Sequence, residues 1–371
     1  MTETTQTPLR DAKIDFDGDV QSGIMQPGPA HLQLIAFDFN DDISAAGIAE
    51  LFRTLTDVSR RLTQGRPVDK FLQREMVEVV ANLTITAGFG ERVFELLGKE
   101  DHKPAGLHDI PAFKRDQLLE HWGQSDFAIQ VCCDDPVTTS TVARLLTTTS
   151  RPWAHVKWFQ KGFGRAFGAV PFGATPRNPM GHLDGTVNPK EPAEWAEQVF
   201  IDSDNPALNN STIMVVRRIV LDLDAWEELE IPEREMVIGR DYHTGAPLSG
   251  GESEFDEEDM DAVDTEGNYL IHRQSHLALS REQDGQPSDA LRRRAYAYED
   301  QPHPAEDPNS NVGLVWIAFQ KNPDNQFSKI QARLDKADML NEWSRHIGSA
   351  VYWIAPGTTE DSYWGQALIE G

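Results

Sequence analysis

The stretch HLQLIAFDF, from His31 to Phe39, is a dense run of strand-forming residues. Residues 43–62 then place apolar side chains at helical spacing, so an amphipathic helix follows the strand. The motif I-A-F-x-x-N inside this stretch (residues 35–40) occurs again at residues 317–322, and helical spacing again follows it, over 327–347. A chance match between short apolar strings is the alternative. The shared strand-then-helix context favours a duplicated α+β unit.

Other segments extend this pattern along the chain. A helix is expected after Pro136, and a helical stretch begins at Trp226. Because a domain averages roughly 150 residues, 371 residues correspond to about two domains. Helices that cover one face of each sheet make the fold class α+β. The remaining predicted strands lie at 83–89, 126–132, 155–160, 212–221, 291–298, 313–320 and 351–354. We divide the chain into an N-terminal extension (1–30), a first domain (31–170) and a second domain (171–371).

The charge balance excludes several classes of partner. Sixty acidic residues stand against 34 basic ones, which gives a net charge of −26. A protein that binds nucleic acid through a basic face, or that adheres to an anionic membrane, needs the opposite sign. No apolar run approaches the ~18 residues of a membrane span. The composition therefore predicts no nucleic-acid partner and no membrane partner.

The N-terminus and the cysteines bear on the compartment. Residues 1–19 contain neither the basic and apolar regions of a signal peptide nor a twin-arginine motif. The two cysteines, Cys132 and Cys133, are adjacent and form no disulfide framework. We expect a cytoplasmic, reducing location, and export with a leader that was later removed is the alternative.

Two irregular segments contain candidate functional groups. In RNPMGHLDGTVNP (177–189), Asp184 lies between glycines and is compatible either with an ordinary Asx turn or with a carboxylate presented into a cavity as an acid/base group. The acidic stretch 250–267 superficially indicates calcium but does not fit the EF-hand loop, so we expect a solvated surface insertion. Common nucleotide, hydrolase and zinc-protease motifs do not occur in the sequence.

The string HRQSHLAL (272–279) holds two histidines four residues apart. On a helix, His272 and His276 would face one metal, but no acidic or cysteine partner has the spacing to complete such a site. Either histidine could equally be a structural polar side chain whose hydrogen bonds are made within the protein. The remaining interpretation is that one of them is an axial haem ligand, which requires only one protein nitrogen.

Three consecutive arginines occupy the predicted strand LRRRAYAY (291–298). Strand alternation directs Arg293 to one side and Arg292 and Arg294 to the other. On the surface they would form a solvated patch. If the strand lines a cavity, Arg293 would stabilise a bound anion or developing negative charge.

Several strings occur in an order that resembles the dye-decolourising peroxidases. They are G-x-x-D-G-T-x-N-P (181–189), S-H-L-A-L-S (275–280), the arginines before the aromatic strand, and G-L-V-W-I-A-F-Q (313–320). The resemblance covers residues 21–364 and is greatest to the A-type branch, which includes deferrochelatase-like members. It implies two ferredoxin-like domains with antiparallel sheets, of the dimeric α+β barrel type, and a haem b in the C-terminal domain.

The resemblance also implies roles for individual residues. His276 would ligate the haem iron, Asp184 would be the distal acid/base residue, and Arg293 would be the distal arginine. Asp338 would hydrogen-bond the other nitrogen of His276. The further cofactor-binding residues would be Arg240 at a propionate, together with Thr186, Asn188, Leu314 and Trp316. Two positions depart from the family pattern, Ala295 where glycine is usual and Trp316 where phenylalanine is common.

The implied activity is that of a haem b peroxidase. It would reduce hydrogen peroxide and oxidise dyes, phenols or other small one-electron donors through a ferryl intermediate, with electrons from bulky donors entering through surface Trp or Tyr. The alternatives are a deferrochelatase-like protein that releases iron from haem and a haem-free acidic binding module. We expect an acidic pH optimum and a preference for cationic or neutral donors, and a homo-oligomer is compatible with the sequence.

Overall fold

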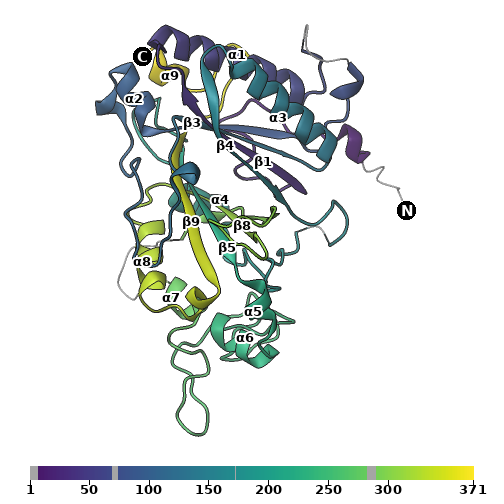
Figure 1. Cartoon of the computed structure of the whole chain (residues 1–371), viewed down its shortest axis with the longest axis vertical. Coiled ribbons are helices and arrows are strands. Elements are labelled where there is room, and N and C mark those ends of the chain that lie inside the picture. The colour runs from purple at the N-terminus through teal and green to yellow at the C-terminus, as the bar shows by residue number, and fades with distance from the viewer. Residues whose placement is uncertain (1–6, 69–73, 172, 282–289) are drawn as a thin grey trace.

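The computed structural model describes residues 7–68, 74–171, 173–281 and 290–371 (Figure 1). The first half contains β1 (His31–Phe39), α1 (Ala45–Thr63), β2 (Thr84–Phe89), α2 (Glu91–Leu97), β3 (Phe127–Cys133), α3 (Pro136–Ser150) and β4 (Ala154–Phe163). The second half contains α4 (Pro192–Gln198), β5 (Thr212–Leu221), α5 (Leu223–Glu227), α6 (Ile231–Ile238), α7 (His276–Ser280), β6 (Arg292–Arg293), β7 (Tyr296–Glu299), β8 (Val312–Gln320), α8 (Phe327–Ala337), β9 (Ser344–Ile354) and α9 (Gln366–Ile369). Short 3₁₀ helices include η4 (Glu120–Trp122) and η5 (Met339–Glu342).

Local sequence fixes the starts of the two long N-terminal helices. The Ser44 hydroxyl accepts a hydrogen bond from the Gly47 amide at the start of α1. The Asp135 carboxylate accepts one from the Thr138 amide at the start of α3, where Pro136 is the first helical residue. Each cap satisfies a backbone donor that has no partner within the helix, and proline is favoured at the first helical position because it lacks that donor.

The strands form one antiparallel sheet that closes on itself. Its order is β5-β9-β2-β3-β1-β4-β7-β8-β6, with a further pairing between β5 and β8. The first half contributes β2-β3-β1-β4, and the second half, listed in the reverse direction, contributes β7-β8-β5-β9. With β6 and β7 counted as one strand, each half therefore has its strands in the order second, third, first, fourth, which is the ferredoxin-like order. Pairing of β2 with β9 and of β4 with β7 joins the halves into a barrel. The predicted α+β class is confirmed.

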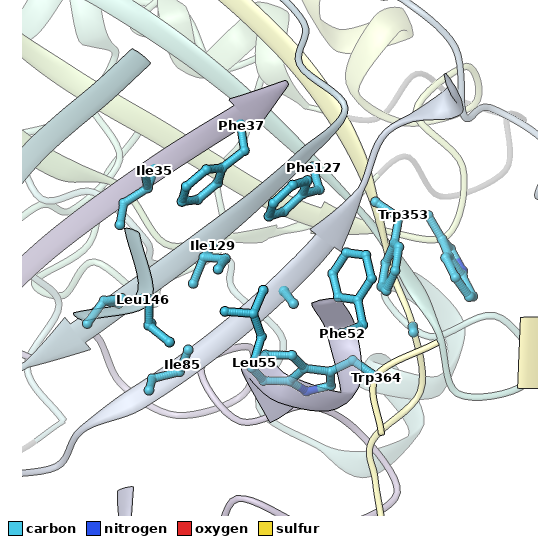
Figure 2. Packing of buried hydrophobic residues seen from close by; sticks show 14 of the residues in the cluster. Ile35, Phe37, Phe52, Leu55, Ile85, Phe127, Ile129, Leu146, Trp353 and Trp364 are labelled. Atoms are coloured by element: carbon cyan, nitrogen blue, oxygen red, sulfur yellow. The ribbon is translucent and has the colours of Figure 1, made fainter. Parts of the chain in front are cut away.

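The barrel strands place apolar side chains in two layers. On β1, Ile35 and Phe37 face outward into a core beneath α1 and α3, where Phe37 stacks on Phe127 with ring centroids 4.7 Å apart (Figure 2). Leu34 and Ala36 on the same strand belong to a second cluster inside the barrel. Because each fully buried Phe stabilises the fold by about 1.5–3 kcal/mol, the outer layer holds α1 and α3 on the sheet. Figure 1 shows these two helices across the N-terminal part of the sheet.

The C-terminal part differs from the sequence-based prediction in one long segment. Helical spacing predicted a helix over 327–347, but α8 ends at Ala337 and β9 begins at Ser344. Asp338 ends the helix in an extended conformation, and its carboxylate accepts the Leu340 amide to start η5. Strand β9 then pairs with β5 along its whole length, so sheet pairing overrides the local periodicity.

Two other local predictions need adjustment. Trp226 lies near the end of α5, which begins at Leu223 after an Asp222 cap, rather than at its start. The I-A-F-x-x-N strings lie in β1, the first strand of its half, and in β8, the third strand of its half when β6 and β7 are counted as one interrupted strand. The duplication is therefore one of strand order and does not follow from those matched strings.

The segment before β1 packs against the rest of the chain. The Phe16 ring is buried against Trp364, with centroids 5.2 Å apart. Val20 forms a bridge with Pro356, and the Gln21 amide donates to the carbonyls of Ala87 and Ala355. Residues 16–21 thus add to the core of the first half. Among the described residues, no helix has both the length and the apolar character needed to cross a membrane.

Candidate active site

The candidate site lies beside α7 in the second half of the chain. The Ser275 hydroxyl caps α7 by accepting the Ala278 amide, which makes His276 the first helical residue. Gly239 ends α6 at φ +92°, and a Cβ there would lie 2.9 Å from the Leu277 Cβ. Glycine at this position therefore lets the segment that carries Arg240 approach the segment that carries His276.

Asp338 orients the His276 imidazole. Its Oδ2 lies 2.7 Å from His276 Nδ1, and the carboxylate is itself almost fully buried. Burial alone would lower the pKa of His276, but the charge and the hydrogen bond of Asp338 outweigh it and the net pKa is raised. Such a carboxylate partner fixes the ring and leaves Nε2 as the nitrogen for a metal.

His276 faces open space rather than packed side chains. It lies deep in the protein, yet 31% of its side-chain surface is accessible. The side chains of Asp184 and Arg293 are each 22% accessible. The charges of Arg293 and Asp184 shift the pKa of His276 in opposite directions, down and up respectively, so both side chains lie within electrostatic range of the imidazole.

The loop that carries Asp184 is held by hydrogen bonds within itself and to residues 242–243. The Arg177 guanidinium donates to the carbonyls of Gly181, Tyr242 and His243. Gly181 has φ +89°, and a Cβ there would collide with the Tyr242 hydroxyl. The Asp184 amide donates to the Pro176 carbonyl at 2.8 Å. These contacts fix the backbone that presents the Asp184 carboxylate.

Asn188 joins this loop to the arginine strand. Its Nδ2 donates to the Arg293 carbonyl at 2.9 Å, and its Oδ1 accepts the Arg293 amide at 2.8 Å. Arg293 Nη2 then lies 3.6 Å from Asp184 Oδ1. The predicted strand 291–298 is interrupted between β6 and β7, but both pieces pair with β8 in one register.

Arg240 lies at the base of the acidic insertion. Its Nη1 donates to the carbonyls of Gly245 and Glu254, at 2.7 and 3.0 Å, and its Nη2 lies 3.4 Å from Glu258. Burial lowers the pKa of Arg240. The Thr186 hydroxyl donates to Glu254 at 2.7 Å. The insertion was predicted to be solvated, and that is wrong for Glu254 and Glu258, whose carboxylates turn back toward Thr186 and Arg240.

The apolar residues predicted for the site lie on β8. Leu314 and Trp316 point away from the barrel interior, which is filled by Val315 and Ile317. Trp316 packs on Phe327 of α8 with ring centroids 5.1 Å apart. Leu314 and Trp316 thus share one face of the strand.

The alternative in which His272 and His276 bind one metal is not supported. Helix α7 begins at His276, so His272 precedes it, is exposed, and accepts the Gln274 amide at 3.1 Å. Within the described ranges, no group of three or more His, Cys, Asp or Glu side chains is arranged to hold a metal ion.

Two buried histidines near the site were missed by sequence reasoning. His182 is 3% exposed, and its Nε2 has no hydrogen-bond partner among the described residues. Burial, with the charges of Arg177 and Arg234, lowers the pKa of His182 to about 4. His346 on β9 accepts from Arg217 Nε at 3.1 Å, and burial lowers its pKa well below the ordinary value. His182 lies inside the motif around Asp184, which was the available signal.

Comparisons with known proteins agree over nearly the whole chain. Residues 21–164 match the family model for the N-terminal part of Dyp-type peroxidases, and residues 175–359 match the model for the C-terminal part. A dye-decolorizing peroxidase of Thermobifida fusca is 34% identical over 97% of this chain and 86% of that protein. A deferrochelatase of Escherichia coli is 29% identical over 99% of this chain and 89% of that protein. The crystal structure of a DyP-type peroxidase from Cellulomonas bogoriensis superimposes with a TM-score of 0.93 at 38% identity, covering 98% of this chain and 100% of that one.

Proposed function

We propose that this chain, which belongs to the Dyp-type peroxidase family and is a haem peroxidase, reduces hydrogen peroxide beside Asp184 and Arg293. In the same proposal, the chain oxidises small donors such as dyes and phenols. The observation that carries the proposal is the pair formed by Arg293 Nη2 and Asp184 Oδ1, 3.6 Å apart, in the region that His276 faces. This pair combines a proton-transfer group with a fixed cation, which are the two groups that cleavage of a peroxide requires.

The residues present fit a haem b. The imidazole of His276 has Nδ1 bound to Asp338 and Nε2 toward accessible space. The guanidinium of Arg240 is a cation suited to an acidic ligand, and buried His182 leaves its Nε2 without a hydrogen-bond partner among the described residues. His276 would hold the iron, Arg240 a propionate, and Leu314 and Trp316 the ring, with Thr186 and Asn188 at its edge. When bound, the haem supplies the redox-active iron at which peroxide reacts.

Asp184 and Arg293 would have different roles in the cleavage of peroxide. Cleavage requires that one peroxide oxygen lose a proton and that the other gain one, so that water leaves. The Asp184 carboxylate accepts the first proton and returns it to the departing oxygen. The Arg293 guanidinium stabilises the negative charge that develops on that oxygen. Asn188 contributes by holding the Arg293 backbone through two hydrogen bonds.

The proposal is tested by rapid mixing of the haem-loaded protein with peroxide. We expect Asp184→Ala and Arg293→Ala to retain the haem absorption band while the peroxide-dependent spectral change slows by about two to four orders of magnitude, the usual contribution of an acid/base group or a charge-stabilising donor. Asp222→Ala, which removes only a helix cap outside the site, is the matched control. A rate in Asp184→Ala equal to that of the wild type would refute the proton-transfer role.

A second candidate function is release of iron from haem. It is favoured by the 29% identity to the Escherichia coli deferrochelatase across nearly the whole chain. Product analysis separates the two functions, because oxidised donor with intact haem supports the peroxidase and free porphyrin supports iron release. The haem-free binding module is disfavoured, since the chain matches peroxidases along nearly its whole length.

A further inference from the structure

The strand that carries Arg293 also carries a buried cation on its opposite face. Arg294 is 4% exposed, and its amide donates to the Ile317 carbonyl at 2.8 Å. Its Nη1 donates to the Cys132 sulfur of β3 at 3.1 Å. Among the described residues, Arg294 Nε and Nη2 have no hydrogen-bond partner, and no carboxylate pairs with this guanidinium. Isolated buried charges are costly, so a guanidinium in this position calls for a counter-charge.

The groups around Arg294 narrow the choice of counter-charge. Arg292 adds a second cation, which donates to the carbonyls of Ile24 and Gln26 rather than to an acid. The Asp134 carboxylate is engaged elsewhere, by the Ala30 amide and the Asn82 side chain at 2.8 Å each. Burial raises the pKa of Tyr296 well above its ordinary value, so this phenol stays neutral. Within the described part of the chain, the acidic group that is hydrogen-bonded to the guanidinium is the Cys132 thiol.

We propose that Cys132 is a thiolate paired with Arg294 inside the barrel, and that it acts as an internal one-electron donor when the enzyme turns over peroxide without an external donor. The redox half of this inference rests on the proposed peroxidase function, whereas the ionisation half does not. Arg293 and Arg294 are consecutive residues, so the thiolate lies behind the same strand that presents Arg293 to Asp184.

The electron balance follows from peroxide reduction. Conversion of hydrogen peroxide to two waters consumes two electrons and two protons, and without a donor both electrons must come from the protein and its cofactor. The thiolate gives one electron and becomes a thiyl radical, with no proton to release. Oxidation of the buried phenol of Tyr296 or Tyr298 would instead require a proton acceptor, and burial raises both phenol pKa values. The same equivalent of peroxide can take a second electron from the thiyl radical, while water adds to the sulfur and one proton is released, which gives a sulfenic acid. In sum, the thiolate, one hydrogen peroxide and one proton become a sulfenic acid and one water.

The neighbouring cysteine is a matched control within the same strand. Cys133 is as fully buried as Cys132 but points to the outer face of β3. Its thiol lies 3.3 Å from the carbonyls of Val80 and Ala81, which accept its hydrogen. Burial raises the pKa of Cys133 to about 12, so it remains a neutral thiol. The two residues therefore share position and burial and differ in the charge beside the sulfur.

The ionisation is tested by infrared spectroscopy of the haem-loaded protein, in the S–H stretching region. We expect one S–H band in the wild type, the same band in Cys132→Ser, and its loss in Cys133→Ser. Arg294→Met should add a second band because the counter-charge is removed, while Arg294→Lys should not. A remaining S–H band in Cys133→Ser would overturn the proposal. This readout does not depend on peroxidase activity.

The redox role is tested by peptide mass spectrometry after peroxide treatment without donor. We expect a several-fold excess of oxidised Cys132 over oxidised Cys133, suppressed when a reducing donor is added. Equal oxidation of the two cysteines, or none at Cys132, would overturn the electron-donor role. If peroxide is not consumed, the proposed function fails, and the infrared result alone then decides whether the ion pair exists.

Discussion

The side chain of Asn188 holds Arg293 by both polar groups of its backbone, donating to the carbonyl at 2.9 Å and accepting the amide at 2.8 Å. These two hydrogen bonds connect the loop of Asp184 to the strand of Arg293, which are more than 100 residues apart in the chain. The 3.6 Å separation between the Asp184 and Arg293 side chains therefore depends on a residue that contributes no charge of its own.

Asn188→Ala should slow the reaction with peroxide while leaving haem in place. Two hydrogen bonds contribute about 1 kcal/mol each, so we expect a loss of roughly tenfold or somewhat more in kcat/KM for peroxide. Because Asn188 positions Arg293 and does not exchange protons, the pH profile should keep its shape. Asn209→Ala, a half-buried asparagine outside the site, is the control. A shifted pH profile would contradict a positioning role.

His276→Ala should abolish stable haem binding, because the imidazole oriented by Asp338 is the proposed iron ligand. The haem absorption band of the purified variant, measured against protein concentration, reports this loss. His272→Ala is the matched control, since it removes an exposed histidine four residues earlier and should bind haem in full. Stoichiometric haem in the His276 variant would refute the ligand assignment.

Asp338→Asn tests the contribution of the Asp338 charge to the His276 imidazole. It keeps a side chain able to hydrogen-bond His276 Nδ1 but removes the negative charge. A less electron-rich imidazole stabilises ferric iron less well, so we expect haem retention together with an increased reduction potential. Spectroelectrochemical titration measures this shift. Asp335→Asn, at a half-buried aspartate on α8 that accepts the Lys114 and Arg115 amides, serves as the control. An unchanged potential in Asp338→Asn would contradict the inferred role.

The fold could be predicted from the sequence further than the site could. Strand β5 can be recognised in the sequence because it is buried and rich in β-branched residues. The start of β9, Ser344-Arg345-His346, is polar, and it is a strand because β5 pairs with it. The alternation of side chains along a strand predicts that Arg293 and Arg294 point to opposite faces. No local pattern in the sequence shows that Asp184 lies beside Arg293 or that Cys132 accepts a hydrogen bond from Arg294.

Glu306 should make stability depend on pH below neutrality. Its carboxylate accepts from Trp122 Nε1 at 2.9 Å and lies 2.9 Å from Arg218, and although burial opposes ionisation, these partners lower the pKa of Glu306 to about 2. Because the folded pKa lies below the unfolded value of about 4.3, the contribution is complete above that value and is lost as pH falls toward 2. Partial solvent screening limits it to about 1–2 kcal/mol.

Urea unfolding at several pH values measures this contribution. Glu306→Gln should be less stable than wild type at pH 7 and should approach wild type as the pH falls, whereas Glu299→Gln, at an exposed glutamate, should track wild type throughout. A stability difference for Glu306→Gln that stays constant down to pH 2 would contradict the lowered pKa.

The net charge of −26 should select among donors by their charge. At low salt, the field of an acidic protein raises the local concentration of cationic donors and lowers that of anionic dyes, so cationic or neutral donors should have the higher kcat/KM. Salt screens this field, with a Debye length of about 8 Å at physiological ionic strength, and the preference should shrink as salt is added. Steady-state rates for a cationic, a neutral and an anionic donor across a salt series test this. An anionic dye that is oxidised fastest at low salt would show that a local surface, rather than the net charge, governs donor encounter.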